Sequence, residues 1–163
     1  MRRDGFTIIE VLIYSALLAI FLGATFAFIS SILGTTDTLL ERNELIANQE
    51  FVERKLSWIV AGATNVVAPI ANSSSSRLQI SVVSSTLNPS IFTFASATGE
   101  IILKTGSMAS ASITNNRVKV KNFWIQNFSN NQSTSTLKIS LSLESSIYPN
   151  LVSTSTFFYA LSQ

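Results

Sequence analysis

Near its start the chain carries a long hydrophobic run that predicts a membrane-length helix. Residues 11–36 are 26 consecutive uncharged positions, most of them apolar. As an α-helix rising ~1.5 Å per residue, this run is about 39 Å long, which exceeds the ~30 Å hydrocarbon core of a bilayer. The pattern therefore predicts a helix that can span a membrane.

A different pattern begins at residue 37. Apolar residues now recur at spacings of seven, four and three, which is typical of one face of a helix. The residues on this face are Leu45, Val52, Leu56 and Ile59. The charged residues Glu41, Glu44 and Arg54 fall off the stripe, so the pattern predicts an amphipathic helix with one buried face.

The two patterns join without a proline between them. We therefore expect one helix from about Gly5 to about Ala61, ended by Gly62. Gly23 and Gly34 lie inside this helix, and each marks a place where the helix can loosen or pack closely on a neighbouring helix.

Beyond Pro69 the apolar period falls to two, and Ser, Thr and Asn become abundant, which predicts β-strands. The clearest half-buried strand alternates polar residues with Leu137, Ile139, Leu141 and Leu143. The other residues expected to point inward are Leu78, Ile80, Val82, Val118, Val120 and Trp124. Phe123 is expected on the opposite face from Trp124.

Turn-forming residues divide this strand region. Thr98 and Gly99 lie between two apolar segments and predict a hairpin. Residues 72–76 are expected to form a loop, and residues 157–161 a last strand. The predicted fold class is α+β, with a long N-terminal helix whose second half is covered by one antiparallel sheet of four to six strands.

The amino-acid composition excludes several classes of function. The 163-residue chain has a net charge of +2 and 12% charged residues, unlike a polybasic nucleic-acid binder or an acidic tail protein. It has no Cys and no His, which excludes disulfides, thiolate or imidazole metal sites and nucleophile–His pairs. Glu100 and Glu144 are the only acids after residue 62 and lie far apart in sequence. No catalytic, cofactor-binding or metal-binding residue is expected, and the chain is not predicted to be an enzyme.

The charges that flank the hydrophobic run predict its orientation. Arg2 and Arg3 precede it and an acidic stretch follows it, so the positive-inside rule places the N-terminus in the cytoplasm and the rest outside. Cleavage of a secretory signal near Ala27 is a rival interpretation, because residues 24–27 offer a small-residue cleavage pattern. The apolar run is longer than that of such signals.

One carboxylate, Glu10, lies at the start of the hydrophobic run. An acid within a bilayer is costly and is a functional residue by default. The alternative is an interfacial acid that the positive end of the helix dipole favours. Taken alone, Glu10 fits both interpretations equally well.

Residues 5–13, Gly-Phe-Thr-Ile-Ile-Glu-Val-Leu-Ile, resemble the cleavage and N-methylation signature of type IV prepilins and of the pseudopilins of type II secretion and competence systems. The resemblance implies cleavage after Gly5 by a prepilin peptidase, methylation of the Phe6 amine and assembly into a helical filament. It favours the functional interpretation of Glu10, whose carboxylate would neutralise the new amine during assembly. Asp4 departs from the usually basic leader of the family.

The same resemblance implies other pilin or pseudopilin subunits, an assembly platform protein and the cytoplasmic membrane as partners. It divides the chain into a leader (1–5), a transmembrane and assembly helix (6–36), an amphipathic half-helix (37–62) and an extracytoplasmic β-rich head (63–163). The order of the strand segments is similar to the heads of J-type minor pseudopilins and related minor pilins. Many major pilins carry a disulfide-closed loop, which a chain without Cys cannot form, so a minor subunit is expected. The alternative is a signal-anchored extracytoplasmic binding domain that does not polymerise.

Four basic residues remain as a candidate contact surface. Arg117, Lys119 and Lys121 alternate along one predicted strand, with Lys138 expected across from them. Their charges suit DNA phosphates or an acidic neighbouring subunit. The third interpretation, which we favour, is a solvated edge that lysines protect against sheet-to-sheet aggregation.

Overall fold

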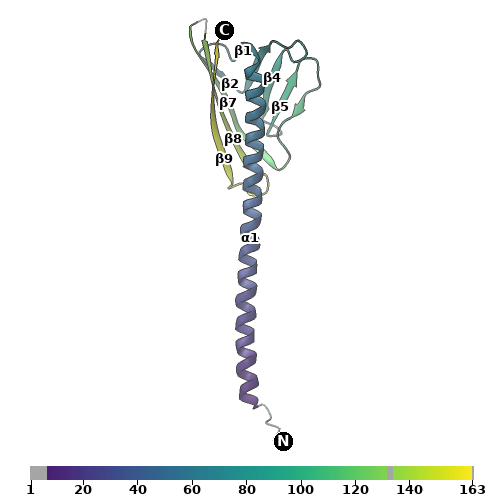
Figure 1. Cartoon of the computed structure of the whole chain (residues 1–163), viewed down its shortest axis with the longest axis vertical. Coiled ribbons are helices and arrows are strands. Elements are labelled where there is room, and N and C mark those ends of the chain that lie inside the picture. The colour runs from purple at the N-terminus through teal and green to yellow at the C-terminus, as the bar shows by residue number, and fades with distance from the viewer. Residues whose placement is uncertain (1–6, 132–133, 163) are drawn as a thin grey trace. The chain divides into compact units, whose positions relative to one another are not determined.

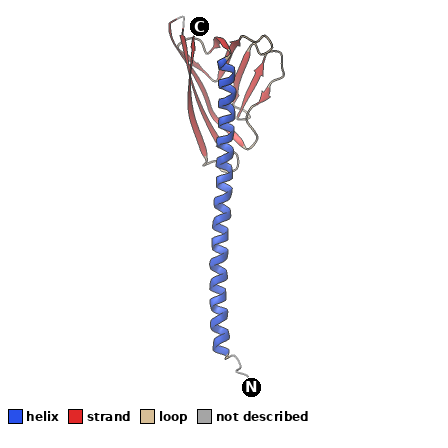
Figure 2. Ribbon diagram, in the orientation of Figure 1, coloured by secondary structure: helices blue, strands red, loops and turns tan. Residues whose placement is uncertain are grey.

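The computed structural model describes residues 7–131 and 134–162, and the chain divides into two compact units, residues 1–40 and 41–163. The described part of the first unit is almost wholly helical, and the second unit combines helix and strands (Figure 2). One helix, α1 (Ile8–Ala61), contributes to both units (Figure 1).

The long helix predicted from the sequence is confirmed. It ends at Ala61, and the N–H of Gly62 donates a 3.1 Å hydrogen bond to the carbonyl oxygen of Ile59. The described helix begins at Ile8, whereas the predicted start near Gly5 lies outside the described residues.

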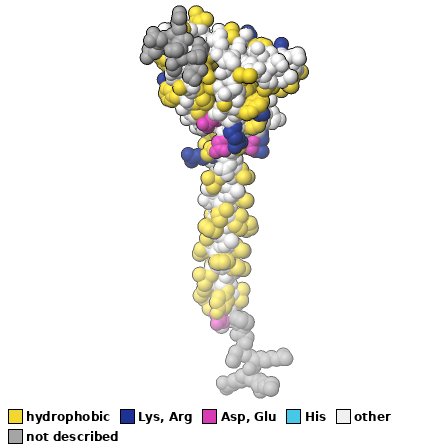
Figure 3. All heavy atoms as spheres, turned by 45° about the horizontal axis from the view of Figure 1, so that its top comes forward, with side chains coloured by type: hydrophobic (Ala, Val, Ile, Leu, Met, Phe, Trp, Pro, Cys, Tyr) yellow, Lys and Arg dark blue, Asp and Glu magenta, His cyan; other side chains and the backbone are white. Residues whose placement is uncertain are grey.

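The first 33 residues of α1, from Ile8 to Leu40, leave their side chains uncovered within this chain. All of them are exposed except Glu10 and Thr25, which are partly exposed. Figure 3 shows hydrophobic side chains along the face of this part of the helix that it draws. By length and composition, α1 is able to cross a membrane.

Among the described residues, nine strands form two antiparallel sheets. The strands are β1 (Ala63–Ala68), β2 (Ser73–Ser75), β3 (Arg77–Val82), β4 (Ser90–Ala95), β5 (Glu100–Thr105), β6 (Ala111–Ser112), β7 (Val118–Asn131), β8 (Thr134–Ser145) and β9 (Val152–Ser162). One sheet has the order β1-β3-β4-β5-β6 and the other β2-β7-β8-β9. The expectation of a single sheet of four to six strands is therefore wrong. Alternation of apolar residues specifies which face is buried, but it does not reveal which strands are neighbours.

The helix and both sheets share one hydrophobic core. The predicted stripe on α1 is buried as expected: Leu45, Val52, Leu56 and Ile59. So are the four inward residues of β8: Leu137, Ile139, Leu141 and Leu143. Burying a side chain of this size contributes roughly 1.5–3 kcal/mol, so these two rows hold the helix end against the sheets.

Glu41 departs from the sequence prediction. It was expected off the buried stripe, yet only 3% of its surface is exposed. Glu41 lies one turn before Leu45 and continues the buried face of α1 toward the first unit. An acid is tolerated there because residues from distant parts of the chain bind both of its oxygens.

The strand residues Phe123 and Trp124 occupy the reverse of their predicted faces. Phe123 is buried and Trp124 is 43% exposed. The pairing of β7 with β8 shifts between Val120 and Asn122, which is an irregularity of the β-bulge type. One extra residue at a bulge exchanges the inward and outward positions of all that follow.

The turn predictions are met in part. Thr98 and Gly99 do connect a hairpin, between β4 and β5, and the predicted last strand is β9. Residues 72–76, expected to be a loop, contain β2, which pairs with β7. β1 was not predicted, because its sequence Ala-Thr-Asn-Val-Val-Ala lacks a regular alternation and its pairing with β3 is irregular.

Candidate functional site

The first turn of α1 holds Glu10 in a reciprocal hydrogen-bond pair with Thr7. The N–H and the hydroxyl of Thr7 each donate to Oε2 of Glu10 at 3.0 Å. The N–H of Glu10 donates in return to the hydroxyl oxygen of Thr7 at 3.4 Å. This is a capping box, in which a Thr and a Glu three residues apart bind the free N–H groups at a helix start.

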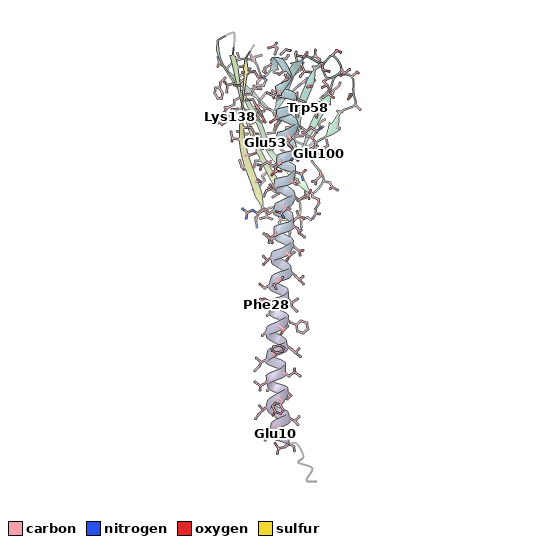
Figure 4. All side chains as sticks on the ribbon, in the orientation of Figure 1. Glu10, Phe28, Glu53, Trp58, Glu100 and Lys138 are labelled. Carbon is pink, nitrogen blue, oxygen red and sulfur yellow. The ribbon has the colours of Figure 1, made fainter. Side chains whose placement is uncertain are left out.

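The capping box was missed from the sequence, although the spacing Thr-x-x-Glu before an apolar run was there to be found. Both Thr7 bonds go to Oε2, and Oε1 has no hydrogen-bond partner within the described part of the chain. Figure 4 shows Glu10 at the N-terminal end of the helix and Phe28 well along it. The predicted cleavage and methylation residues Gly5 and Phe6 lie outside the described residues.

A second polar cluster surrounds Glu41, where α1 enters the sheet-bearing unit. Oε2 of Glu41 accepts a 2.9 Å hydrogen bond from the hydroxyl of Ser145. Oε1 pairs with the guanidinium of Arg117. The Ser145 bond, together with Arg117, holds the pKa of Glu41 below its usual value in spite of burial.

The next turn of α1 extends this cluster. Oε1 of Glu44 accepts hydrogen bonds from the side-chain amides of Asn48, at 3.1 Å, and of Asn115. Oδ1 of Asn48 in turn accepts a 3.2 Å bond from the N–H of Asn115. The helix is thereby tied to the segment before β7 and, through Ser145, to the end of β8.

The four basic residues singled out in the sequence have different surroundings. Arg117 pairs with Glu41 of the helix, and Lys121 pairs with Glu144 of β8. Lys119 is exposed and has no ion pair within the described residues. Lys138 lies opposite Gln126 in the pairing of β7 with β8, and therefore several residues along the sheet from Lys119 and Lys121.

The acids of the strand region do not converge. Glu100 begins β5 in one sheet, whereas Glu144 lies in β8 of the other sheet and is engaged by Lys121. Figure 4 labels Glu100 and Lys138 on the two different sheets. In the described part of the chain, no group of three or more acids could hold a metal ion.

Comparison with known protein families finds a known motif at the start of the chain. Residues 1–26 match the family model described as the prokaryotic N-terminal methylation motif. No match was found among curated proteins or among solved structures. The motif covers the segment that contains Gly5, Phe6 and Glu10, and the helix that follows is packed on antiparallel sheets, as in a pilin. The methylation motif and the pilin-like fold together support a relationship of this chain to the type IV pilins and pseudopilins.

Proposed function

We propose that this protein is the precursor of a filament subunit that a prepilin peptidase cleaves after Gly5 and methylates at Phe6. The observation that carries the proposal is the uncovered apolar surface of α1 from Ile8 to Leu40. Such a surface requires lipid around the precursor and other apolar helices around the assembled subunit. The methylation motif at its start supports this order of events.

Glu10 is proposed to select the register of assembly. It is the only acid between residues 7 and 36, so it is the only negative side chain within the apolar surface. Cleavage would create a positive amine on Phe6, and two opposite charges in a low-dielectric bundle attract strongly. Oε1 of Glu10 has no partner among the described residues, which leaves an acceptor for the amine of the same or a neighbouring subunit.

We propose that the filament is a type IV pilus or the pseudopilus of a type II secretion or competence system, and that this chain is a minor subunit. The absence of Cys supports a minor role, as does the likeness of the strand order to J-type heads. The N-terminus would lie in the cytoplasm and residues 63–163 outside the cytoplasmic membrane. An assembly platform protein and other pilin-like subunits are the expected partners.

The role proposed for the basic residues is structural and not DNA binding. The ion pairs of Arg117 with Glu41 and of Lys121 with Glu144 support this role, because both cations are engaged within the chain. A structural role is also proposed for the protein as a whole, in place of catalysis. The separation of Glu100 from Glu144 supports that reading.

A signal-anchored domain that does not polymerise is the second candidate. The capping box favours it, because Thr7 already satisfies Oε2 of Glu10 and the helix start then needs no partner subunit. The two candidates differ in what the removal of Glu10 would do. An anchor would tolerate the loss, whereas a filament subunit would lose its pairing group.

The test compares Glu10→Val with Ile9→Val, an apolar exchange at the neighbouring position. Both variants should insert into the membrane as well as the unaltered protein, because neither adds a charge to the apolar run. Glu10→Val should reduce recovery in the sheared filament fraction by about tenfold or more, since the Phe6 amine is left unpaired. Equal recovery of the two variants would contradict the pairing role, and absence of the unaltered protein from filaments would favour the anchor.

A further inference from the structure

Three large aromatic side chains lie uncovered on the outer face of the β2-β7-β8-β9 sheet. Trp124 and Phe128 of β7 are 43% and 49% exposed, and Phe158 of β9 is 66% exposed. The intervening residues of β7 point into the core, as the burial of Phe123 and Ile125 shows. Aromatic rings bury much apolar surface when they find a partner, so a group of exposed rings indicates a contact surface.

The pairing of β7, β8 and β9 places these three rings next to one lysine, Lys138. Lys138 lies directly opposite Phe158 on one side and Gln126 on the other. Trp124 pairs with Ser140 and Phe128 with Thr136, which makes both rings diagonal neighbours of Lys138. Direct cross-strand neighbours lie about 5 Å apart and diagonal ones about 7–8 Å, so all three rings are within reach of the lysine side chain.

The outward positions close to the rings are polar but almost uncharged, whereas Lys119, Lys121 and Glu144 lie farther along the same side of the sheet. Hydroxyl and amide side chains occupy the neighbouring outward positions: Ser74, Asn122, Gln126, Thr136, Ser140, Ser142, Thr154 and Thr156. Lys138 is the one charged residue among them. It has no ion-pair partner in the part of the chain that the structure describes.

We propose that this face binds an acidic glycan, meaning a chain of sugar rings that carries carboxylates. A sugar ring presents C–H groups on its faces and hydroxyls around its rim. The faces would stack on Trp124, Phe128 and Phe158, and the hydroxyls would exchange hydrogen bonds with the surrounding amides and hydroxyls. A carboxylate of the glycan would supply the acid that Lys138 lacks.

The charge of the face favours a glycan over a single-stranded nucleic acid. Nucleic acids carry one phosphate per nucleotide, and proteins that bind them neutralise several phosphates with Lys and Arg. Here a single cation lies among the three rings. Lys121, near one end of the sheet, is already paired with Glu144.

The experiment measures glycan binding by the purified full-length protein in detergent, which does not depend on filament formation. The chain has two tryptophans, so Trp58→Phe leaves Trp124 as the single fluorescent indole. Titration with oligogalacturonate, hyaluronan fragments or alginate fragments should give a saturable change in Trp124 fluorescence for at least one of them. Neutral cellohexaose should bind about tenfold more weakly, because it offers no carboxylate to Lys138.

Two kinds of variant, which remove either a ring or the lysine charge, test whether these side chains bind the glycan. Phe158→Ala should weaken binding of the acidic glycan about tenfold, and Phe128→Ala provides a second ring removal in case the first unfolds. Lys138→Gln should reduce the affinity for the acidic glycan to that for cellohexaose and remove its salt dependence. Lys119→Gln, which lies away from the rings, is the matched control and should leave binding unchanged.

Absence of a saturable response to all three acidic glycans would overturn the proposal. Tight binding of oligothymidylate in place of the glycans would also overturn it and assign the face to nucleic acid. Mass analysis of the mature N-terminus is a separate measurement, so failure here leaves the proposed subunit function standing.

Discussion

The hydroxyl of Ser145, at the end of β8, donates a 2.9 Å hydrogen bond to Oε2 of Glu41 in α1, 104 residues earlier in the chain. Ser145 is itself held by the N–H groups of Ile147 and Tyr148, which donate to its hydroxyl oxygen at 3.2 and 3.1 Å. Arg117 binds the other oxygen of Glu41. The acid is therefore fixed by two segments that the helix meets only in the folded head. Figure 3 shows acidic and basic side chains gathered at this end of the sheet-bearing unit.

Glu41→Gln is expected to lower the melting temperature of the head at pH 7 by several degrees, because the ion pair with Arg117 is lost. The folded-state pKa of Glu41 lies below its unfolded value, so its contribution is complete above about pH 4.5 and is lost as the pH falls through the folded pKa. The difference between the two proteins should therefore shrink on acidification. Thermal melts of both proteins from pH 7 to pH 3 measure this difference in melting temperature.

Glu50→Gln is the control for this experiment, since the side chain of Glu50 is exposed and its contact with Arg54 is 3.8 Å long. Such surface pairs contribute little. A melting temperature as low in Glu50→Gln as in Glu41→Gln, or a difference that does not change with pH, would show that the buried position of Glu41 has no special role.

Two glycines with positive φ angles should respond differently to substitution by alanine. Gly99→Ala meets no atom closer than 3.6 Å, so its cost is the left-handed conformation itself, about 1–2 kcal/mol. Gly106→Ala would place its Cβ 2.2 Å from the carbonyl oxygen of Thr86 and should cost considerably more. Urea denaturation of both variants checks the order. Equal unfolding free energies would contradict the close approach of Gly106 to Thr86.

Charge reversal separates the structural and DNA-binding interpretations of the basic residues. Lys121→Glu loses the ion pair with Glu144 and places an acid beside it, so it should destabilise the head. Lys119→Glu also faces Glu144 across the strands but loses no ion pair, so it should destabilise the head less. DNA retention should be the same for both variants and for the unaltered protein. A salt-dependent loss of retention in Lys119→Glu, with the fold intact, would show that DNA is a partner after all.

Periodicity predicted those parts of the fold that depend on burial alone. The stripe through Leu56 and the alternation through Ile139 are apolar because water is excluded from one face, and a single sequence records that directly. The assignment of the described strands to two sheets depends on which strand edges meet, and no local pattern encodes that assignment. The reversal at Phe123 and Trp124 has the same origin, because one extra residue in a bulge exchanges inward and outward positions.

The surroundings of Glu10 and Glu41 also differ in how far a local sequence pattern reveals them. Glu10 was singled out as a candidate because its neighbours in sequence form a recognisable motif, and its hydrogen-bond partner Thr7 is three residues away. Glu41 was misplaced because a carboxylate is ordinarily a surface residue, and the partners that permit its burial are 76 and 104 residues distant. The aromatic face around Lys138 was likewise invisible, since it combines residues from different strands.

Intact mass analysis of the mature protein, with sequencing of its N-terminal peptide, tests the central claim most directly. The account predicts a chain that begins at Phe6 and carries a methyl group on its amine. A mature chain that still contains Met1 to Gly5, or one that begins near residue 28, would contradict the account.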